Sequence, residues 1–295
     1  MKSPENSEFG VEQESKLEKG YERLFELVRE SSVVSEKENK EWSLDGLELS
    51  LSDSLEKAGE RSLKDNDGKI FTTLSGGLDS TLALAFLRKN FPNNEIITFA
   101  MGGSEDHPDV KYARLAAEKF ESQQCEIIPT PEEINMALME YHEKFPEKDL
   151  NEVIKAGDLD VYLLYKKIAE NPDRPKTVIV HDGIDELMGG YWQHRKSPEK
   201  EEQKKVFNEF WQKLIPKHLI PLTGTASGFN INLIFPYLNK EIINTISEIP
   251  IGDRISQSEN IGKIPLREIA KKMEVPEEII NRPKKGQVGM LIVNE

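Results

Sequence analysis

A scarcity of cysteine is the first feature of this 295-residue sequence, which contains a single one, Cys125. One thiol excludes an intrachain disulfide framework, a cysteine-rich zinc site and any mechanism that needs a second, resolving thiol. Cys125 lies in the apolar run QQCEIIP, so we expect it to be a small buried residue.

Long hydrophobic runs and excess positive charge are also missing. No stretch approaches the length of an apolar membrane span, and the amino-terminal residues MKSPENSEFG lack the apolar core of a signal peptide. The sequence therefore predicts a cytoplasmic protein with no membrane partner. The 39 Lys and Arg residues are outnumbered by 53 Asp and Glu, giving a net charge of -14. This balance argues against nucleic-acid binding, because contacts to phosphate backbones need clustered Lys and Arg.

The sequence divides into two parts of different composition. Residues 1–50 are rich in Glu, Lys and Ser, and we interpret them as a helical, partly disordered extension. Within it, LEKGYERLFELVRE has apolar residues at helical spacing, and a polar loop follows. A second helix, LSLSDSLEKAGERSL, leads into what we interpret as a single domain covering residues 51–295.

From residue 69 onward, short apolar runs alternate with helical patterns. The expected strands are residues 69–74, 95–100, 124–128 and 176–180, and the helices between them are residues 79–90, 109–120, 131–144 and 158–170. Such alternation predicts an α/β fold with a doubly wound parallel sheet. The last third is predicted to be helical near residues 205–218, 239–248, 263–273 and 276–281. Before it, the charged run at residues 197–205 is interpreted as a solvated face or a loop.

The string SGGLDS separates the first expected strand from the first expected helix of the sheet. In an open parallel sheet, ligands bind beyond the carboxyl ends of the strands. Gly76 and Gly77 would let backbone amides approach an anion closely, and the start of the helix adds the positive end of its dipole. The hydroxyls of Ser75 and Ser80 are further donors. The string therefore predicts a phosphate-binding loop.

Asp79 is the exceptional member of that string, because a carboxylate repels phosphates. It fits if Mg²⁺ bridges Asp79 to the phosphates; the alternative is an ordinary strand–turn–helix connection in which Asp79 pairs with the helix dipole. The loop has no lysine of the Walker type, and the sequence contains no G-x-G-x-x-G dinucleotide fingerprint. Neutralising positive charge must therefore come from elsewhere in the chain.

Four segments, in order, carry a resemblance to a known family. LSGGLDS resembles the PP-loop of the N-type ATP pyrophosphatases. HDGIDELMGGY, FPYLNKEIINTISEIP and GKIPLREIAKKMEVPEEIINRPKKG resemble three segments of the asparagine synthetases, the last one through the pattern K-x-x-L-R-E followed by R-x-K. Over residues 51–286 the chain is similar to the synthetase domain of that family, which also includes β-lactam synthetases and peptide-cyclising enzymes. The resemblance implies a PP-loop sheet of the adenine nucleotide α-hydrolase type with a helical carboxyl-terminal part.

The activity implied is an ATP-dependent ligation of a carboxylate to an amine. ATP would convert the carboxylate into an acyl-adenylate with release of pyrophosphate, and the amine would then displace AMP. Aspartate and ammonia are the default substrates. Two alternatives stay open: an enzyme that forms a β-lactam or another amide in a biosynthetic pathway, and an inactive nucleotide-binding subunit.

The resemblance also implies roles for particular residues. Asp79 and Asp185 would hold Mg²⁺, and Lys284 would lie on the α-phosphate of ATP. Pyrophosphate would be cradled by the SGGLDS loop through Ser75, Gly76, Gly77 and Ser80. Adenosine would meet the backbone at Leu74 and Met101, with Gly183 close to the ribose. Solvent exposure is the default expectation for Arg282 and Lys285, the charged neighbours of Lys284, although Arg282 also fits the family pattern. His194 is expected at the surface.

Asp182 is a departure from the family pattern. Asparagine synthetases carry Glu at this position and β-lactam synthetases carry Tyr, and here His181 also replaces the usual preceding Gly. A carboxylate at residue 182 favours a general base that deprotonates the incoming amine. The alternative is a carboxylate that only supports the loop.

A glutaminase domain is not expected in this chain. Relatives with that domain carry a nucleophilic cysteine after the initiator Met, whereas residue 2 here is Lys and the residues before the core are too few. The implied ligase would therefore use free ammonia, ammonia from a separate glutaminase subunit, or another amine.

Overall fold

The structure, a computed structural model, describes residues 20–35, 41–146, 149, 153–154 and 157–283. Its centre is a five-stranded parallel sheet with the strand order β3-β2-β1-β4-β5. The strands are β1 (Lys69–Thr73), β2 (Glu95–Met101), β3 (Gln123–Ile127), β4 (Thr177–Ile179) and β5 (Asn232–Ile234).

The order in which the chain adds strands to the parallel sheet reverses between β1 and β4. Successive strands β1, β2 and β3 are laid down toward one edge, after which the chain returns and adds β4 and β5 on the other side of β1. In an open parallel sheet, the ligand-binding crevice is expected at such a reversal, outside the carboxyl ends of the strands, which here are β1 and β4. The SGGLDS loop follows β1, and residues 181–186 follow β4, so both open at this crevice.

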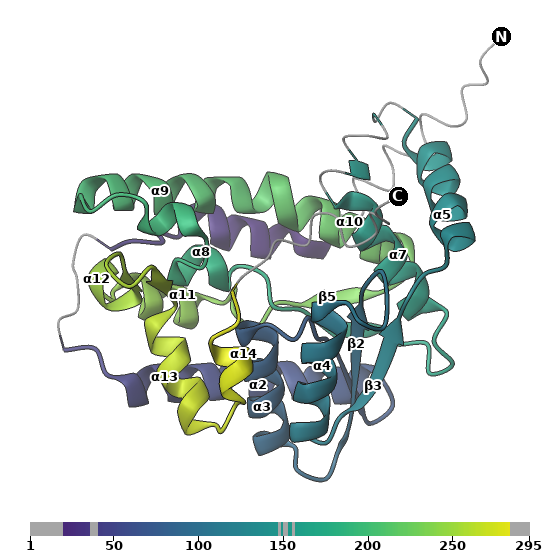
Figure 1. Cartoon of the computed structure of the whole chain (residues 1–295), viewed down its shortest axis with the longest axis horizontal. Helices are drawn as coiled ribbons and strands as arrows, with labels where there is room; N and C mark the ends of the chain where they lie inside the picture. The colour runs from purple at the N-terminus through teal and green to yellow at the C-terminus, as the bar shows by residue number, and fades with distance from the viewer. Residues whose placement is uncertain (1–19, 36–40, 147–148, 150–152, 155–156, 284–295) are drawn as a thin grey trace.

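Helices cover the sheet, as Figure 1 shows, with α3 and α4 lying side by side over one face. The helices are α2 (Leu44–Asp65), α3 (Leu78–Asn90), α4 (Pro108–Lys119), α5 (Pro131–Lys144), α7 (Asp158–Ala169), α8 (Ile184–Met188), α9 (Lys200–Leu214), α10 (Ile220–Gly228), α11 (Lys240–Ser247), α12 (Ile251–Arg254), α13 (Ile264–Lys272) and α14 (Glu277–Ile280). A 3₁₀ turn, η1 (Trp192–Arg195), follows α8, and a π-helical turn, η2 (Ile215–Leu219), joins α9 to α10. A short antiparallel hairpin, β6 (Ile255–Ser256) and β7 (Ile261–Gly262), precedes α13.

The expected doubly wound sheet is confirmed, and its four predicted strands agree with the observed ones within two residues at each end. The fifth strand, β5, was not predicted, since only three residues pair there. The charged run at residues 197–205 is not a loop throughout, because α9 already begins at Lys200; its charged side chains form the solvated face of that helix.

Residues 20–30 form a helix that packs into the main core through Phe25 and Val28. The chain continues with Val33, whose side chain is fully buried. Together with α2, this amino-terminal helix shares one hydrophobic cluster with the sheet. In the part of the chain that the structure describes, every helix is too short or too polar to cross a membrane.

Candidate active site

The SGGLDS loop is held in shape by its own hydroxyl groups. The backbone amide of Ser75 donates to the Ser80 hydroxyl at 3.2 Å, and the two serine hydroxyls are also 3.2 Å apart. Gly76 has a φ of 63° and lies so close to α4 that a Cβ there would meet the backbone nitrogen of Ala113 at 2.4 Å. Only glycine combines that φ with so close an approach.

Helix α3 begins in this loop without a side-chain cap. Gly77 is its N-cap residue and makes no side-chain capping hydrogen bond. Its first amides therefore point out of the helix end together with the positive end of the dipole, which is a favourable arrangement for a phosphate. Asp79 lies in this first turn.

Asp185 is presented by α8, a single turn bounded by two glycines. Gly183 has a φ of 92° and Gly189 a φ of 70°, so the chain enters and leaves the turn in the left-handed region. The next residue, Gly190, has no room for a side chain, because a Cβ would lie 1.7 Å from Oδ1 of Asp185. The glycines of GIDELMGG thus fix the position of one carboxylate.

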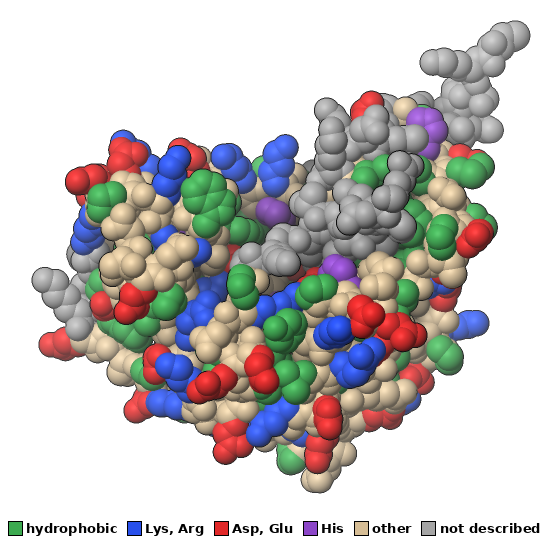
Figure 2. Space-filling view, in the orientation of Figure 1, with side chains coloured by type: hydrophobic (Ala, Val, Ile, Leu, Met, Phe, Trp, Pro, Cys, Tyr) green, Lys and Arg blue, Asp and Glu red, His purple; other side chains and the backbone are tan. Residues whose placement is uncertain are grey.

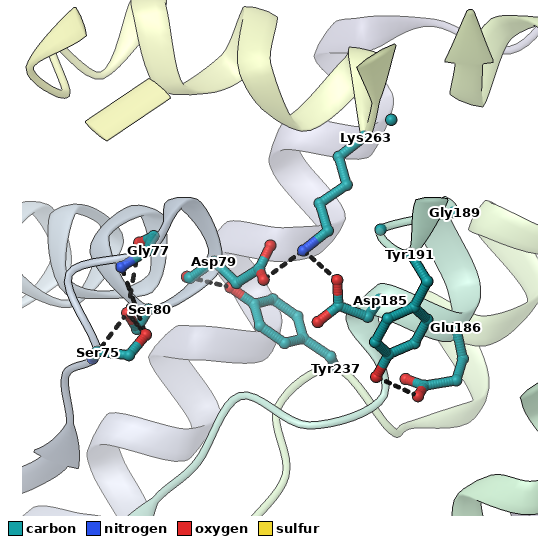
Figure 3. Close-up of polar contacts among 12 residues, drawn as sticks. Ser75, Gly77, Asp79, Ser80, Asp185, Glu186, Gly189, Tyr191, Tyr237 and Lys263 are labelled. Carbon is teal, nitrogen blue, oxygen red and sulfur yellow. Dashed lines mark hydrogen bonds and ion pairs between the residues drawn. The ribbon is translucent and has the colours of Figure 1, made fainter. Parts of the chain in front are cut away.

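Asp79 and Asp185 converge on a single cation, the ammonium of Lys263 (Figure 3). The Lys263 Nζ atom lies 2.5 Å from Oδ2 of Asp79 and 2.5 Å from Oδ1 of Asp185. All three side chains are largely buried, with Lys263 only 8% exposed. The two predicted metal ligands therefore meet across one cation-sized position.

Burial and charge act in opposite directions on Lys263. Burial alone would lower the pKa of its ammonium, but the attraction of Asp185 and Asp79 outweighs this effect and raises the pKa above its usual value. Lys263 is thus a permanent cation here. Figure 2 shows further Lys and Arg side chains around a hollow at the middle of this face, near α8, α13 and α14. Arg267 interacts electrostatically with Asp79, and Arg195 interacts in the same way with Asp185.

Tyr237 forms a hydrogen bond with the backbone of Asp79 in the SGGLDS loop. It is fully buried, and its hydroxyl donates to the backbone carbonyl of Asp79 at 3.1 Å (Figure 3). Burial, with a smaller contribution from the Asp79 charge, raises the pKa of Tyr237 well above its usual value, so the phenol stays protonated. This bond fixes the main chain from which the Asp79 carboxylate projects.

Glu186 and Tyr191 form a second polar pair behind Asp185. The Tyr191 hydroxyl donates to Oε1 of Glu186 at 2.9 Å, and Glu186 is buried. Burial raises the pKa of Tyr191, and the charges of Glu186 and Asp185 raise it further. Asp182, at the start of the same segment, is half-buried. Burial raises the pKa of Tyr165, and the charge of Asp182 raises it further.

Arg282 joins the carboxyl-terminal part of the chain to the SGGLDS loop. Its guanidinium donates to the carbonyl of Ser75 at 2.9 Å, forms an ion pair with Asp109 at the start of α4, and lies 4.6 Å from the ring centre of Tyr112. The expectation that Arg282 is exposed is therefore wrong: its side chain is only 10% exposed. The planar guanidinium satisfies three partners at once, which a solvated arginine would not do.

The remaining predicted residues fall into three groups. Leu74 and Met101 lie at the ends of neighbouring strands, with the Leu74 amide already donating to the Phe99 carbonyl at 2.8 Å. Lys284 and Lys285 lie outside the described residues. His194, which was expected at the surface, is instead fully buried with its ring centre 4.4 Å from that of Phe207; three aromatic rings surround it, so the polar side chain is covered.

Lys263 was the functional side chain that the sequence interpretation did not assign. The signal was present, because Lys263 is the first residue of the K-x-x-L-R-E pattern. Its role was hidden because residue 263 is 184 positions from Asp79, and only the folded chain brings the two together.

The donor set fits Mg²⁺. Two carboxylates converge on one position, and Mg²⁺ in proteins is commonly held by one or two carboxylates together with phosphates and water. No group of three or more His, Cys, Asp or Glu side chains converges anywhere in the described ranges, so a complete protein cage is not formed there. A metal at Asp79 and Asp185 would thus share its coordination with a second molecule, and the uncapped end of α3 is suited to bind the phosphates of that molecule.

Comparison with known proteins identifies a family. The family model for asparagine synthase matches residues 50–222 and 224–291. Human asparagine synthetase (glutamine-hydrolyzing) is 30% identical over 225 residues, covering 75% of this chain and 39% of that protein. The probable asparagine synthetase (glutamine-hydrolyzing) of Acanthamoeba polyphaga mimivirus is 26% identical over 247 residues, covering 83% of this chain and 44% of that protein. The chain thus spans less than half the length of the curated relatives it matches.

Among solved structures, the NH3-dependent NAD synthetase of Campylobacter jejuni aligns with 83% of this chain and 99% of that chain. The identity is 16% and the TM-score is only 0.36. The family assignment therefore rests on the sequence matches and their extent. By that criterion the chain belongs to the asparagine synthase family.

Proposed function

We propose that this chain is an ATP-dependent, AMP- and pyrophosphate-forming ligase that joins a carboxylate to an amine through an acyl-adenylate. The observation that carries the proposal is the convergence of Asp79 and Asp185, from the ends of β1 and β4, on one cation position beside the uncapped end of α3. Family membership supports aspartate and ammonia as the substrates.

Each part of the site has a role in this proposal. Mg²⁺ and ATP would supply the activated phosphate. The carboxylates of Asp79 and Asp185 would hold the metal, and the first amides of α3 would bind the departing pyrophosphate. The buried cation of Lys263 would offset the negative charge that builds up as the phosphates separate. Lys284 is proposed to add a second cation on the α-phosphate.

The amine side of the reaction is assigned to Asp182. The residue follows β4 in the same segment as Asp185, so a nucleophile bound there would lie at the crevice. A carboxylate within hydrogen-bond reach could accept a proton from an ammonium ion or amine. A separate glutaminase subunit is proposed as one source of ammonia.

The test is ATP–pyrophosphate exchange with the purified chain across a panel of carboxylic acids. Exchange with aspartate, followed by asparagine formation on adding ammonium, is the expected result. Exchange with a different acid alone would favour the amide- or β-lactam-forming alternative. ATP binding without exchange for any acid would contradict the proposed ligase and favour a nucleotide-binding subunit.

Asp79→Asn provides the internal check. It removes one metal ligand but keeps the size of the side chain, and the exchange rate should fall by at least about 100-fold. Asp53→Asn is the matched control, because the Asp53 side chain on α2 is 48% exposed and pairs only with Lys57 among the described contacts. That variant should exchange at the wild-type rate within about twofold.

A further inference from the structure

Lys263 fills the position that a divalent metal would take between Asp79 and Asp185. We propose that Lys263 is a resident counter-ion: it keeps free divalent metal out of the site and gives way when the phosphates of a nucleotide arrive, so that metal and nucleotide bind together. This inference rests on the proposed function, since it concerns the order of binding at the same two carboxylates.

The lysine is held in place by its main chain. Lys263 is the N-cap residue of α13 with a φ of 59° and a ψ of 37°, in the left-handed region that few non-glycine residues adopt. Its amide donates to the carbonyl of Met188, the last residue of α8, at 3.1 Å. The backbones that carry Lys263 and Asp185 are therefore joined directly.

The side chain reaches the carboxylates through a gap that depends on glycine. A Cβ at residue 190 would lie 2.5 Å from Cε of Lys263 as well as 1.7 Å from Oδ1 of Asp185. Gly190 therefore leaves the space that the end of the Lys263 side chain and the Asp185 carboxylate occupy. The close packing around this contact and the 8% exposure of Lys263 distinguish it from a chance surface ion pair.

Charge explains why free metal would be disfavoured. With Lys263 between them, the two carboxylates keep one net negative charge, and adding a divalent ion would leave the cluster positive. Arg267 and Arg195 lie close enough to sense Asp79 and Asp185, respectively, and they raise the positive potential further. In a poorly solvated site, like charges a few ångströms apart repel strongly. Bare metal therefore competes with an ammonium that is already bound.

The phosphates of a nucleotide change the competition between the Lys263 ammonium and the metal. They bring several negative charges and supply the metal ligands that the protein lacks, and they offer the ammonium new acceptors. The lysine head sits on a flexible four-carbon stem, so it can turn from carboxylate to phosphate without movement of the backbone. By linkage, nucleotide should then raise the affinity for metal, and metal should raise the affinity for nucleotide by the same factor.

The experiment measures binding of Mn²⁺ by electron paramagnetic resonance, with and without a non-hydrolysable ATP analogue. Wild-type protein should bind Mn²⁺ at least about tenfold more tightly when the analogue is present. Lys263→Met should bind Mn²⁺ without nucleotide at least about tenfold more tightly than wild type, because the competing ammonium is gone. The double variant Lys263→Met with Asp185→Asn should lose this gain.

Two further variants serve as controls. Lys263→Arg keeps a positive charge beside the two carboxylates and should still exclude Mn²⁺ in the absence of nucleotide. Lys271→Met removes an exposed lysine from the same helix and should leave Mn²⁺ binding unchanged. Circular dichroism establishes that each variant is folded; if Lys263→Met does not fold, the wild-type and Lys263→Arg measurements still test the proposal.

The inference is overturned if wild-type protein binds Mn²⁺ equally well with and without the analogue, or if folded Lys263→Met gains no affinity. Either result, together with normal ATP–pyrophosphate exchange, would leave the proposed function intact. Failure of wild-type protein to bind the ATP analogue under any condition, with no exchange, would instead contradict the proposed function.

Discussion

His181 follows the end of β4 by two residues, and one of its ring nitrogens is fixed by the main chain. Its Nε2 lies 3.0 Å from the carbonyl oxygen of Thr73 and 3.0 Å from the hydroxyl of Thr72. Because a carbonyl can only accept, Nε2 carries the proton, and Nδ1 of the neutral ring is an acceptor. That Nδ1 atom is buried without a hydrogen-bond partner among the described residues. Burial lowers the pKa of His181 to about 4, with the Thr73 hydrogen bond opposing the shift.

This environment predicts a pH-dependent stability. The pKa of His181 is about 4 in the folded chain and 6.5 when it is unperturbed, so between these values the unfolded state binds the extra proton. Stability from the neutral ring is complete above pH 6.5 and is lost as the pH falls toward 4, by up to about 3 kcal/mol. Urea unfolding at a series of pH values should show this loss in wild type and a flatter profile in His181→Gln. Parallel profiles for the two proteins would contradict the assignment.

Single residues also show how far sequence alone can lead. Asp79 and Asp185 could be paired in advance because the resemblance to the asparagine synthetases assigns both residues to the metal. Lys263 could not be placed, since a K-x-x-L-R-E pattern does not reveal where its first side chain points. Arg282 was misplaced for a related reason. Solvent exposure is the default for arginine, and its three partners come from the SGGLDS loop and α4, far away in sequence.

At the scale of elements, α14 is fastened to the first half of the sheet by Arg282. The arginine follows α14 by two residues, and its ion pair with Asp109 holds it against the start of α4. Through Arg282, the carboxyl-terminal part of the described chain is thus joined to both the SGGLDS loop and α4.

A double-mutant cycle tests the fastening. Arg282→Met and Asp109→Asn should each destabilise the fold, and their coupling energy should be about 1 to 3 kcal/mol because the two side chains are only 10% and 17% exposed. The free energy of unfolding of the four proteins supplies the measurement. Arg282→Lys should recover little, since an ammonium cannot replace the planar fork.

The exposed pair Lys57 and Asp53 on α2 is the matched comparison for that cycle. Its side chains are largely solvated, and the coupling energy there should be much smaller than between Arg282 and Asp109. Equal coupling in the two pairs would show that Arg282 is an ordinary surface residue.

The elements themselves were predictable to different degrees. Long, strongly patterned segments such as β2 and α5 were located within two residues, because their burial and capping signals are local. Strand β5 pairs over only three residues, and its strand character comes from its alignment with β4. A π-helical turn joins α9 to α10 and was not predicted from the sequence. It contains Pro216, whose ring removes a backbone hydrogen-bond donor from the helix.

At the scale of the whole molecule, the amino-terminal helix closes the edge of the sheet. Strand β5 is an edge strand, and its Leu233 amide donates to the Tyr21 hydroxyl at 2.7 Å. The indole of Trp211 in α9 donates to the carbonyls of Val28 and Ser31. Arg254 donates to the carbonyls of Val33 and Leu187, which connects this segment to α8. The first described helix is thus part of the structure that positions the site.

Removing one oxygen atom should expose this dependence. Tyr21→Phe leaves the ring in place but deprives the buried Leu233 amide of its acceptor, at a cost of about 1 to 3 kcal/mol in the free energy of unfolding. Tyr112→Phe is the control, because the Tyr112 hydroxyl makes no hydrogen bond among the described residues and its ring contact with Arg282 is retained. Chemical denaturation of both variants provides the measurement. A neutral effect of Tyr21→Phe would mean that water replaces the hydroxyl at this edge.

The separation of Lys263 from Asp79 has a consequence for how the protein is made. The two residues are 184 positions apart, so at about 5 to 20 residues per second a ribosome adds the lysine roughly 10 to 40 s after the aspartate. Throughout that interval the growing chain carries the Asp79 carboxylate, and later the Asp185 carboxylate as well, without the cation that neutralises both in the finished fold. The charge balance of the site is thus a feature that the chain can acquire only after Lys263 has been added.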